Sequence, residues 1–134
     1  MISYCDTSVL IYWLDQVGPF HIRARNRFQS LEAAKDQMAV SYLTRLEYRV
    51  GPLKRRDTAA LKVFDDFFAR SDVQLVPLSA AVFERAAQLR VDLNVKTPDA
   101  LHLAAAIESG CDRFLTNDNR LSKCIDITVE VLPP

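Results

Sequence analysis

Short apolar runs alternate with longer segments along the chain, and each kind of segment predicts a different element. The short runs are too brief for helices and are typical of strands buried on both faces. They are Ile2–Cys5, Met38–Ser41, Val73–Val76, Arg113–Thr116 and Ile127–Leu132. The longer segments carry apolar residues at helical spacing. They predict helices over Ser8–Leu14, over His21–Asp36, from about Thr44 to Gly51-Pro52, over Thr58–Arg70, from the capping Ser79 to Leu93, and from Thr97 to Gly110.

Strands that alternate with helices in this way predict an α/β sandwich with a mostly parallel sheet. Local signals indicate some helix ends. Thr97 is expected to be an N-cap with Pro98 at the first helical position, and Gly110 suits a C-cap. The 134 residues contain no linker-like stretch and no internal repeat. We therefore expect residues 1–134 to form a single domain.

The charge composition narrows the class of function. Seventeen basic and seventeen acidic residues cancel, which argues against a protein that coats nucleic acid by bulk charge. This balance is still compatible with a nuclease that has acids at its site and bases on its rim. The bases are unevenly spread, with one group at Arg23, Arg25 and Arg27 and another between Arg45 and Arg56. A solvated helix face is the simpler explanation of each group.

Location and redox state follow from what the sequence lacks. It has no run of about 18 apolar residues, and its start has neither the basic nor the apolar region of a signal peptide. We therefore expect a cytoplasmic protein with no membrane span. Cys5, Cys111 and Cys124 are too few and too scattered for a disulfide framework, and we expect them to be reduced. His21 and His102 lack partners at metal-ligand spacing, and His102 is expected on a helix surface or rim.

Four acidic residues carry the main functional signal. Asp6, Glu47, Asp99 and Asp118 each follow a predicted strand or begin the helix after it. In a parallel α/β sheet these segments open onto one edge, so the four acids are expected to meet in one cleft. Like charges confined together repel one another unless a cation lies between them, and Mg²⁺ or Mn²⁺ suits oxygen ligands. Such sites commonly catalyse phosphoryl or phosphodiester transfer.

Each of these acids also has a purely structural explanation. Asp6 suits a helix N-cap, and Glu47 follows Thr44 by three residues, as in a capping box. Asp99 lies in the first turn of its helix, where the helix dipole favours negative charge, and Asp118 suits an Asx turn. Four independent caps need not face a common point, whereas the ligands of one metal must do so.

The residues around the four acids resemble the PIN-domain family and, within it, the VapC-like toxic ribonucleases of toxin–antitoxin modules. The resemblance covers the whole chain, including its length and element order. Each motif is weak alone, and the four together in order are fairly specific. They are Tyr-Cys-Asp-Thr-Ser-Val-Leu-Ile at the start, Ser-Tyr-Leu-Thr-Arg-Leu-Glu-Tyr-Arg-Val-Gly around Glu47, Thr-Pro-Asp-Ala-Leu-His-Leu-Ala-Ala-Ala around Asp99, and Phe-Leu-Thr-Asn-Asp-Asn-Arg-Leu around Asp118.

The resemblance implies a three-layer α/β/α sandwich with a five-stranded, mostly parallel sheet, and a Mg²⁺- or Mn²⁺-dependent endoribonuclease acting on RNA. Asp6, Asp99 and Asp118 would hold one or two ions, and Glu47 would hold a metal or orient the attacking water. Flanking polar residues are suited to orient the carboxylates or waters. They are Thr7, Ser8, Thr116 and Asn117. Many relatives carry a further acid shortly after the threonine–x–aspartate motif, where this chain has Asn119-Arg120. Occupancy of a second metal position is therefore open.

The same resemblance implies a cognate antitoxin as partner, and we expect a homodimer. Family antitoxins wrap the toxin with an apolar helix and send a basic residue towards the acidic site. Two apolar stretches are candidate contact surfaces, namely Phe64, Phe67 and Phe68 on one predicted helix and the segment Val9–Leu14. The alternative for both is burial in the domain's own core or in the homodimer.

Other functions fit part of the pattern. A haloacid-dehalogenase-like phosphatase would use Asp6 as its nucleophile but wants a second aspartate at the position of Ser8. A receiver-type signalling domain wants an acidic pair near the first strand, where only Asp6 is present. A housekeeping PIN nuclease without an antitoxin and a catalytically silent scaffold are the remaining alternatives. Intact acids at all four positions argue against the scaffold.

Overall fold

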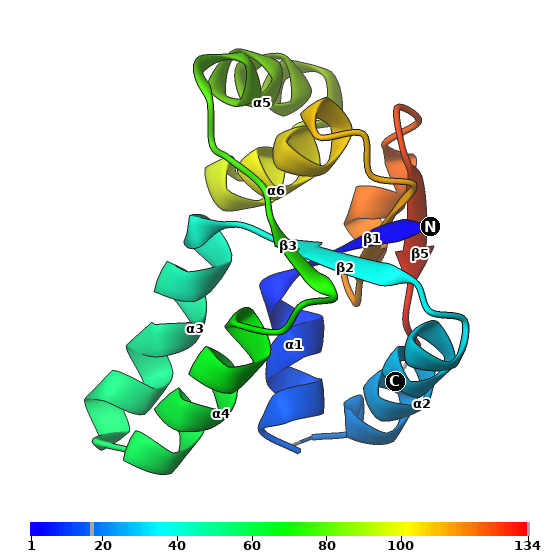
Figure 1. Cartoon of the computed structure of the whole chain (residues 1–134). Helices are drawn as coiled ribbons and strands as arrows, with labels where there is room; N and C mark the ends of the chain where they lie inside the picture. Colours follow the sequence, from blue (N-terminus) through cyan, green and yellow to red (C-terminus); the bar gives the residue numbers. More distant parts are fainter. Residues whose placement is uncertain (17, 134) are drawn as a thin grey trace.

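The computed structural model describes residues 1–16 and 18–133. They form a sheet of five strands with helices on both faces (Figure 1). The strands are β1 (Ile2–Cys5), β2 (Gln37–Val40), β3 (Val73–Leu75), β4 (Arg113–Thr116) and β5 (Thr128–Val131). The helices are α1 (Thr7–Leu14), α2 (His21–Ala33), α3 (Tyr42–Arg55), α4 (Thr58–Phe68), α5 (Ala80–Leu93), α6 (Thr97–Glu108) and the short 3₁₀ helix η1 (Asn119–Lys123). The predicted α/β/α sandwich is confirmed, and every strand pair is parallel.

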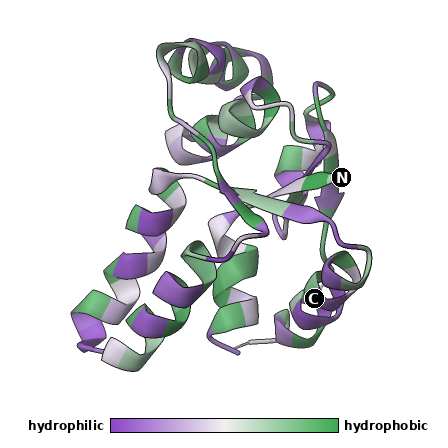
Figure 2. Ribbon diagram, viewed as in Figure 1, coloured by the Kyte–Doolittle hydropathy of each residue, from purple (hydrophilic) through white to green (hydrophobic). Residues whose placement is uncertain are grey.

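Alternate residues of the three central strands, β1, β2 and β4, enter two separate cores. Tyr4 and Phe114 pack between the sheet and helices α5 and α6, whereas Cys5 and Leu115 pack against the helices of the other face. Figure 1 shows α5 and α6 above the sheet and α1 to α4 below it. Because both faces are covered, the strands need no polar face, and this is why they appear in the sequence as continuous apolar runs. The helices that cover them carry both hydrophilic and hydrophobic residues (Figure 2).

The strand order reverses beside β1. In the order β3-β2-β1-β4-β5, the chain builds outward from β1 to β3 and then returns to the other side of β1 with β4 and β5. The segment after β1 packs in the core of α1 to α4, whereas Leu121 of η1, after β4, packs in the core of α5 and α6. The two connections therefore diverge and leave a crevice at the carboxyl ends of β1 and β4. Ligands of open α/β sheets bind at such a point.

Helix α3 is longer at both ends than the sequence predicted. It begins at Tyr42 rather than about Thr44, and it continues through the predicted stop at Pro52 to Arg55. Thr44, Tyr48 and Pro52 are four residues apart and form the buried face of this helix. Packing of that face outweighs the one backbone hydrogen bond that a proline cannot donate.

The start of α6 is a smaller correction. Lys96, not Thr97, holds the N-cap position, so Pro98 is the second helical residue and Asp99 the third. Proline is tolerated there because the first N–H groups of a helix have no partner inside it. Two other predictions are confirmed. The Ser79 side chain accepts from the N–H of Val82 (3.3 Å), and Gly110 takes a positive φ of 72° just after the helix.

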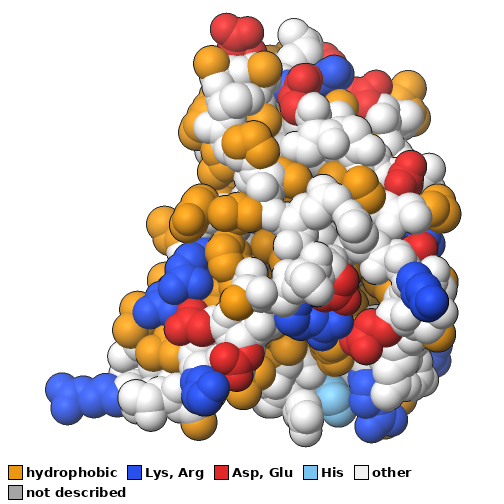
Figure 3. All heavy atoms as spheres, viewed as in Figure 1, with side chains coloured by type: hydrophobic (Ala, Val, Ile, Leu, Met, Phe, Trp, Pro, Cys, Tyr) orange, Lys and Arg blue, Asp and Glu red, His pale blue; other side chains and the backbone are white. Residues whose placement is uncertain are grey.

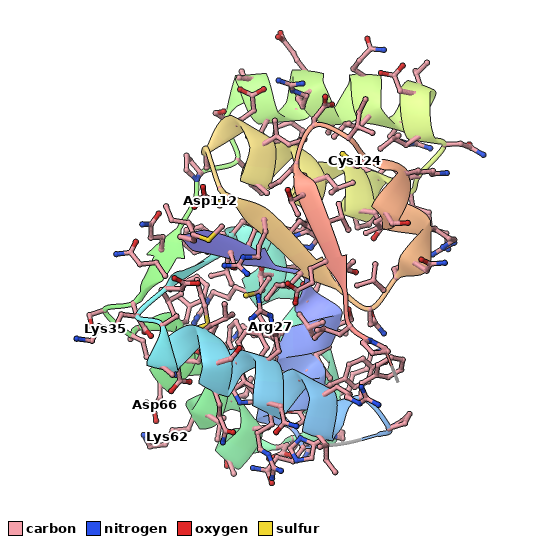
Figure 4. All side chains as sticks on the ribbon, turned by 90° about the vertical axis from the view of Figure 1, so that its right-hand side faces the viewer. Arg27, Lys35, Lys62, Asp66, Asp112 and Cys124 are labelled. Carbon is pink, nitrogen blue, oxygen red and sulfur yellow. The ribbon has the colours of Figure 1, made fainter. Side chains whose placement is uncertain are left out.

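The amino-terminal edge of the sheet is held by ion pairs. Arg113 of β4 donates to Asp36 (3.0 Å), which also pairs with the N-terminal amine (3.2 Å). Arg27 of α2, which is labelled in Figure 4, makes two hydrogen bonds to Glu130 of β5, at 2.6 and 2.9 Å. These contacts connect the start of the chain, the segment between α2 and β2, and the elements α2, β4 and β5.

The apolar stretches proposed as partner surfaces are largely internal. Phe64 and Phe67 are 0% and 3% exposed, and Trp13 stacks on Phe28 with ring centroids 4.1 Å apart. The explanation by burial is therefore right for most of both stretches. Four exposed apolar side chains lie instead along one helix, α3. We call this set the α3 stripe: Tyr42, Leu46, Val50 and Leu53, which are 62%, 61%, 45% and 55% exposed. In Figure 3, orange side chains are interspersed with basic ones on the side of the molecule where α3 lies. None of the helices in the described part of the chain has the length and apolar character to span a membrane.

Candidate functional site

The four predicted acids meet in one open pocket of about 330 Å³ at the crevice between β1 and β4. We call it the acid pocket. Its lining residues are Asp6, Thr7, Ser8, Ile11, Glu47, Asp99, Asn117 and Asp118. They come from α1, α3, α6 and the residues that follow β1 and β4. The predicted convergence of acids more than a hundred residues apart is therefore present, and their roles in metal binding stay a prediction.

Asp6 is the most buried of the four acids. It directly follows β1, its carboxylate accepts from the Thr116 hydroxyl at 2.7 Å, and the residue is 8% exposed. It stands at the N-cap position of α1, yet its side chain makes no capping hydrogen bond. The same Thr116 hydroxyl accepts from the N–H of Asp118 (3.0 Å), so one threonine connects two of the acids. Capping therefore does not account for the carboxylate of Asp6.

Glu47 lies in the second turn of α3. The capping box predicted for Thr44 and Glu47 is wrong, because Thr44 itself caps the helix by accepting from the N–H of Ser41 at 3.1 Å. The Glu47 carboxylate is used differently. Its Oε1 is 2.5 Å from His102 Nε2 and accepts from the Thr7 hydroxyl at 2.8 Å. Both contacts use the same oxygen, and Oε2 accepts no hydrogen bond from the described residues.

His102 is the functional residue that sequence reasoning placed wrongly. It is 1% exposed rather than on a surface or rim, and its Nδ1 lies 2.7 Å from the hydroxyl of Tyr4. That hydroxyl is 2.9 Å from Ser41 Oγ. Because a carboxylate can only accept, the proton between His102 and Glu47 is assigned to Nε2 of the ring. The available signal was spacing: His102 follows Asp99 by three residues and so lies on the same helix face.

Asp118 and Arg120 form a local pair at the rim of the pocket. The guanidinium of Arg120 donates to both oxygens of Asp118, at 3.0 and 2.6 Å, and the N–H of Arg120 donates to one of them at 3.0 Å. The predicted local turn at Asp118 is thus present. Arg120 occupies the stretch where many resembling sequences carry a further acid. The chain therefore has a cation where many resembling sequences have an anion.

The remaining predicted polar residues also lie at the pocket. Ser8 donates to the side-chain oxygen of Asn117 at 2.6 Å, which joins the start of α1 to the segment after β4. Thr7 and Thr116 each donate to an acid of the pocket, as described above. All four flanking residues are therefore in contact with the acid cluster or with one another.

Burial and like charge oppose ionisation at two of the acids. Burial raises the pKa of Asp6, and the nearby charges of Asp99 and Glu47 raise it further, against the opposing effects of His102 and the Thr116 hydrogen bond. Burial also raises the pKa of Asp99, and the charge of Asp118 adds to it. In the ionised state these two carboxylates are destabilised by their surroundings.

The other two acids have local partners that favour ionisation. Burial disfavours charge on Glu47, but the hydrogen bond and positive charge of His102, together with Thr7, lower its pKa overall. The hydrogen bonds from Arg120 lower the pKa of Asp118. Among the described residues, two acids of the pocket are therefore paired with basic side chains and the other two are not.

The donor set suits a hard divalent cation. Carboxylates are the ligands that Mg²⁺ and Mn²⁺ prefer, and a cation would relieve the repulsion that raises the pKa of Asp6 and Asp99. Within residues 1–16 and 18–133, no three Asp, Glu, His or Cys side chains are already arranged to hold a metal ion. The hydrogen bonds of Glu47 and the ion pair of Asp118 explain this, because both carboxylates are directed to protein partners. Chemically the set fits the ion, and the rotamers of these acids would have to adjust.

Comparison with known protein families matches residues 3–125 to the PIN domain. The chain belongs to the PIN domain family. This membership agrees with the resemblance drawn from the four acidic motifs. The matched region contains all four acids together with His102 and Arg120. A comparison with curated proteins gave no significant match.

Solved structures that resemble this PIN domain come from toxin–antitoxin systems. One is VapBC2 of Rickettsia felis bound to a DNA fragment from its promoter, with a TM-score of 0.80, 20% identity, and coverage of 98% of this chain and 99% of that one. A toxin–antitoxin complex from Klebsiella pneumoniae has a TM-score of 0.70 and 26% identity, and covers 94% and 95% of the two chains. VapC20 of Mycobacterium tuberculosis, a toxin that cleaves the sarcin–ricin loop, has a TM-score of 0.66 and 18% identity, with 84% and 86% covered. The VapC-like fold is therefore established over nearly the whole PIN domain.

Proposed function

We propose that this PIN domain is a Mg²⁺- or Mn²⁺-dependent endoribonuclease, the toxin of a toxin–antitoxin pair that works in the cytoplasm. The observation that carries the proposal is the meeting of Asp6, Glu47, Asp99 and Asp118 in one pocket at the reversal of strand order. Hydrolysis of phosphodiester bonds is the reaction that divalent ions held by carboxylates commonly support. The similar VapC20, described as a toxin that cleaves the sarcin–ricin loop, supports RNA as the substrate class.

In this proposal Asp6, Asp99 and Asp118 hold the ion. When bound, the ion lowers the pKa of a water molecule and neutralises charge on the phosphodiester. The buried hydroxyl of Thr116 holds the Asp6 carboxylate at its 2.7 Å contact. Because Arg120 already neutralises part of the charge of Asp118, we propose a single ion rather than two.

Glu47 orients the attacking water and accepts its proton. His102 and Thr7 both contact Oε1, and this leaves Oε2 available to a water molecule in the pocket. The rigid chain from His102 through Tyr4 to Ser41 is buried, so the orientation of Glu47 is set from inside the fold. A positioned carboxylate of this kind contributes about 10²–10⁴-fold to a proton transfer.

The proposal is tested with purified protein on total RNA. Wild type is expected to cut RNA with Mg²⁺ or Mn²⁺ and not with EDTA, and Asp99→Asn is expected to cut far more slowly in every condition. A generic phosphomonoester serves as control for a haloacid-dehalogenase-like phosphatase. Cleavage that persists in EDTA would contradict the metal, and phosphomonoester hydrolysis without RNA cleavage would contradict the substrate class.

Toxicity separates a toxin from a housekeeping PIN nuclease. Expression of the wild-type protein alone is expected to arrest growth, and expression of Asp99→Asn is expected to be harmless. The similar solved structures from Rickettsia felis and Klebsiella pneumoniae are described as toxin–antitoxin assemblies, which supports this reading. Harmless expression of a protein that cuts RNA in vitro would instead indicate a housekeeping enzyme.

We further propose that the antitoxin covers the α3 stripe. Its four apolar side chains are each 45–62% exposed and lie on the helix that carries Glu47, so a partner seated there reaches the edge of the acid pocket. An apolar helix of the antitoxin is the occupant of matching chemistry. A homodimer of the toxin through the same stripe is the competing possibility.

Substitution on the stripe distinguishes these occupants. Leu46→Glu combined with Leu53→Glu is expected to leave RNA cleavage intact and to abolish inhibition by the antitoxin of the same module. Arg25→Glu, on the exposed part of α2, is the matched charge control. If the double variant instead turns a dimer into a monomer in light scattering and stays inhibited, the stripe is a self-association surface and the antitoxin assignment is wrong.

A further inference from the structure

A second hollow of about 200 Å³ lies directly beside the acid pocket. It is formed by the end of α5, the start of α6 and η1, and we call it the basic hollow. Its lining residues are Arg90, Asn94, Val95, Lys96, Asp99, Arg120, Leu121 and Lys123. Asp99 belongs to the lining of both the acid pocket and the basic hollow, so the two are continuous. Four of the lining side chains are cationic, and one is acidic.

Most of these cations have no acidic partner. In the part of the chain that the structure describes, no ion pair is formed by Arg90, Lys96 or Lys123, and all three are exposed. Arg120 pairs with Asp118 of the acid pocket. Several arginines elsewhere are paired with acids, as Arg113 is with Asp36 at 3.0 Å. Cations that converge without partners repel one another, and an anion between them removes that cost.

The backbone around these exposed cationic side chains is held in place by the fold. Asn94 ends α5 in the left-handed conformation (φ 52°), which turns the chain sharply towards Lys96. Arg90 Nε donates to the carbonyl of Val95 at 3.3 Å, so the stem of this arginine is held against the turn while its terminal amino groups stay free to bind. Leu121 is 1% exposed and anchors η1 to the core. The cations are thus presented from anchored backbone.

We infer that the basic hollow binds a backbone phosphate of the RNA strand next to the bond cut in the acid pocket. This inference rests on the proposed ribonuclease function. Guanidinium and ammonium groups are the usual phosphate ligands of proteins. The volume holds one such group with a few waters, at roughly 30 Å³ for each water. A strand that has one phosphate over Asp99 in the acid pocket continues into the basic hollow because Asp99 lines both.

The zero net charge of the chain makes the position of the basic hollow, beside the acid pocket, relevant to RNA binding. The chain has equal numbers of basic and acidic residues, so it has no general attraction for RNA. The acid pocket itself repels phosphate. Local cations beside it are therefore needed to keep a polyanion at the site, and Lys96 lines the basic hollow together with Asp99 of the acid pocket. The basic hollow is the place where unpaired cations adjoin the acids.

The test measures binding separately from cleavage. A short single-stranded RNA is titrated with Asp6→Asn protein in EDTA, so that neither metal nor turnover contributes, over a series of salt concentrations. Lys123→Gln and Lys96→Gln in this background are each expected to weaken binding severalfold. Each is expected to lower the slope of log K against log salt by about 0.7, the value for one phosphate contact of a single strand. Circular dichroism confirms that each variant is folded.

Lys62→Gln is the matched control. Lys62 is an exposed lysine of α4 that lies far from Cys124, the residue directly after η1 (Figure 4). It is expected to change neither affinity nor slope. If Lys96→Gln and Lys123→Gln behave like Lys62→Gln, the inference is wrong whether or not the wild type cuts RNA. If both lose RNA binding while the wild type cuts no RNA, the phosphate site stands and the ribonuclease proposal fails. If RNA binding is unchanged and antitoxin binding weakens, the hollow serves the protein partner and the inference is overturned.

Discussion

The two edges of the sheet differ in whether their acidic side chains are paired with basic groups. At the amino-terminal edge, Asp36 is 13% exposed and is paired with both Arg113 and the N-terminal amine. At the carboxyl-terminal edge, Asp6 and Asp99 face other acids and, among the described residues, neither is paired with an arginine or lysine. Both edges carry acids, but the carboxyl-terminal edge leaves two of its acids, Asp6 and Asp99, without an arginine or lysine partner among the described residues.

The difference between the two edges indicates which acids contribute to stability and which contribute to function. A neutralised acid supports the fold, whereas two buried or half-buried carboxylates that repel each other cost stability in the absence of a cation. Asparagine would satisfy the Thr116 hydrogen bond that Asp6 makes without that cost. The negative charge of Asp6 and Asp99 is therefore best explained by a cation that these acids bind. Substitution of asparagine for aspartate at each edge tests this difference between the two edges.

The largest effect is expected from Asp99→Asn. This change keeps the shape of the side chain and removes one charge from the acid pocket. Mutation of a residue that only supports a metal ligand typically lowers metal affinity or activity by about 10–100-fold. Loss of a ligand itself should therefore lower the rate of RNA cleavage by at least about two orders of magnitude. Cleavage rates at saturating Mg²⁺ check this. A wild-type rate in Asp99→Asn would leave only the helix-dipole explanation for this residue.

Asp36→Asn, at the opposite edge, is expected to lower the stability of the fold and to leave RNA cleavage unchanged. It leaves Arg113, which is 15% exposed, without its nearest carboxylate, and breaking a largely buried pair in this way costs about 3 kcal/mol. Urea unfolding measures the loss, and RNA cleavage per folded molecule should be unchanged. Asp66→Asn is the control, because its pair with Lys62 is exposed at 67% and 77% and an exposed pair contributes at most about 1 kcal/mol. Equal losses in the two variants would contradict the assigned role of burial.

Asp6→Asn should stabilise the metal-free protein. It removes a desolvated charge whose pKa the fold raises, and single relieving changes of this kind contribute about 1 kcal/mol, or roughly 2–4 °C in melting temperature. Addition of Mg²⁺ should raise the melting temperature of the wild type and have much less effect on Asp6→Asn. Calorimetry with EDTA and with Mg²⁺ measures both. An equal Mg²⁺ shift in the two proteins would exclude Asp6 as a ligand.

The pH dependence of this difference has a definite sign. A carboxyl whose pKa is raised by folding binds protons more tightly in the folded state, so the stability it contributes falls as pH rises through its folded pKa. The advantage of Asp6→Asn over wild type should therefore be largest at neutral pH. It should shrink as the pH falls through the raised pKa of Asp6 towards the ordinary aspartate value. A gap that grows on acidification would show that the folded pKa of Asp6 is lowered, not raised.

His102→Gln is expected to have a smaller effect on the reaction. It removes the partner that lowers the pKa of Glu47, while burial continues to raise that pKa. The acidic limb of the pH–rate profile should move to higher pH, and the maximal rate should fall by about 10–100-fold, as for other residues that position a reacting group. A lower rate with an unmoved profile would show that His102 acts only through packing.

Sequence periodicity was sufficient for the fold. All five strands and the six α-helices of the described residues were predicted, because strands covered on both faces read as uniform apolar runs such as Ile2–Cys5. Errors occurred where tertiary packing overrides a local signal. Pro52 should end α3, but it continues the buried face begun by Thr44 and Tyr48. The sequence of the α3 segment alone does not show that tertiary packing compensates for the effect of the proline.

The site was predicted as a set of positions, not as a set of contacts. Topology was enough to bring Asp6 and Asp118 together, because both follow strands that flank the reversal of strand order. It could not show that Glu47 is bound to His102 or that Arg120 is paired with Asp118, since both depend on side-chain rotamers. The misplacement of His102 came from reading it alone, without the neighbouring Asp99 on its helix face.

Arg120→Ala is expected to have the smallest effect, and it refines the contrast between the edges. Among the described residues, Arg120 is the one arginine or lysine that forms an ion pair with an acid of the pocket, and its side chain is 69% exposed, so its removal should hardly change stability. The pKa of Asp118 should return towards the ordinary aspartate value. Because the guanidinium no longer competes for Asp118, Mg²⁺ should bind a few-fold more tightly in calorimetric titrations without RNA. Arg120→Asp should go further and raise the number of bound ions from one to two, and Arg25→Ala on α2 is the control. If all three variants bind Mg²⁺ like the wild type, Arg120 does not compete with the ion and Asp118 is not among its ligands.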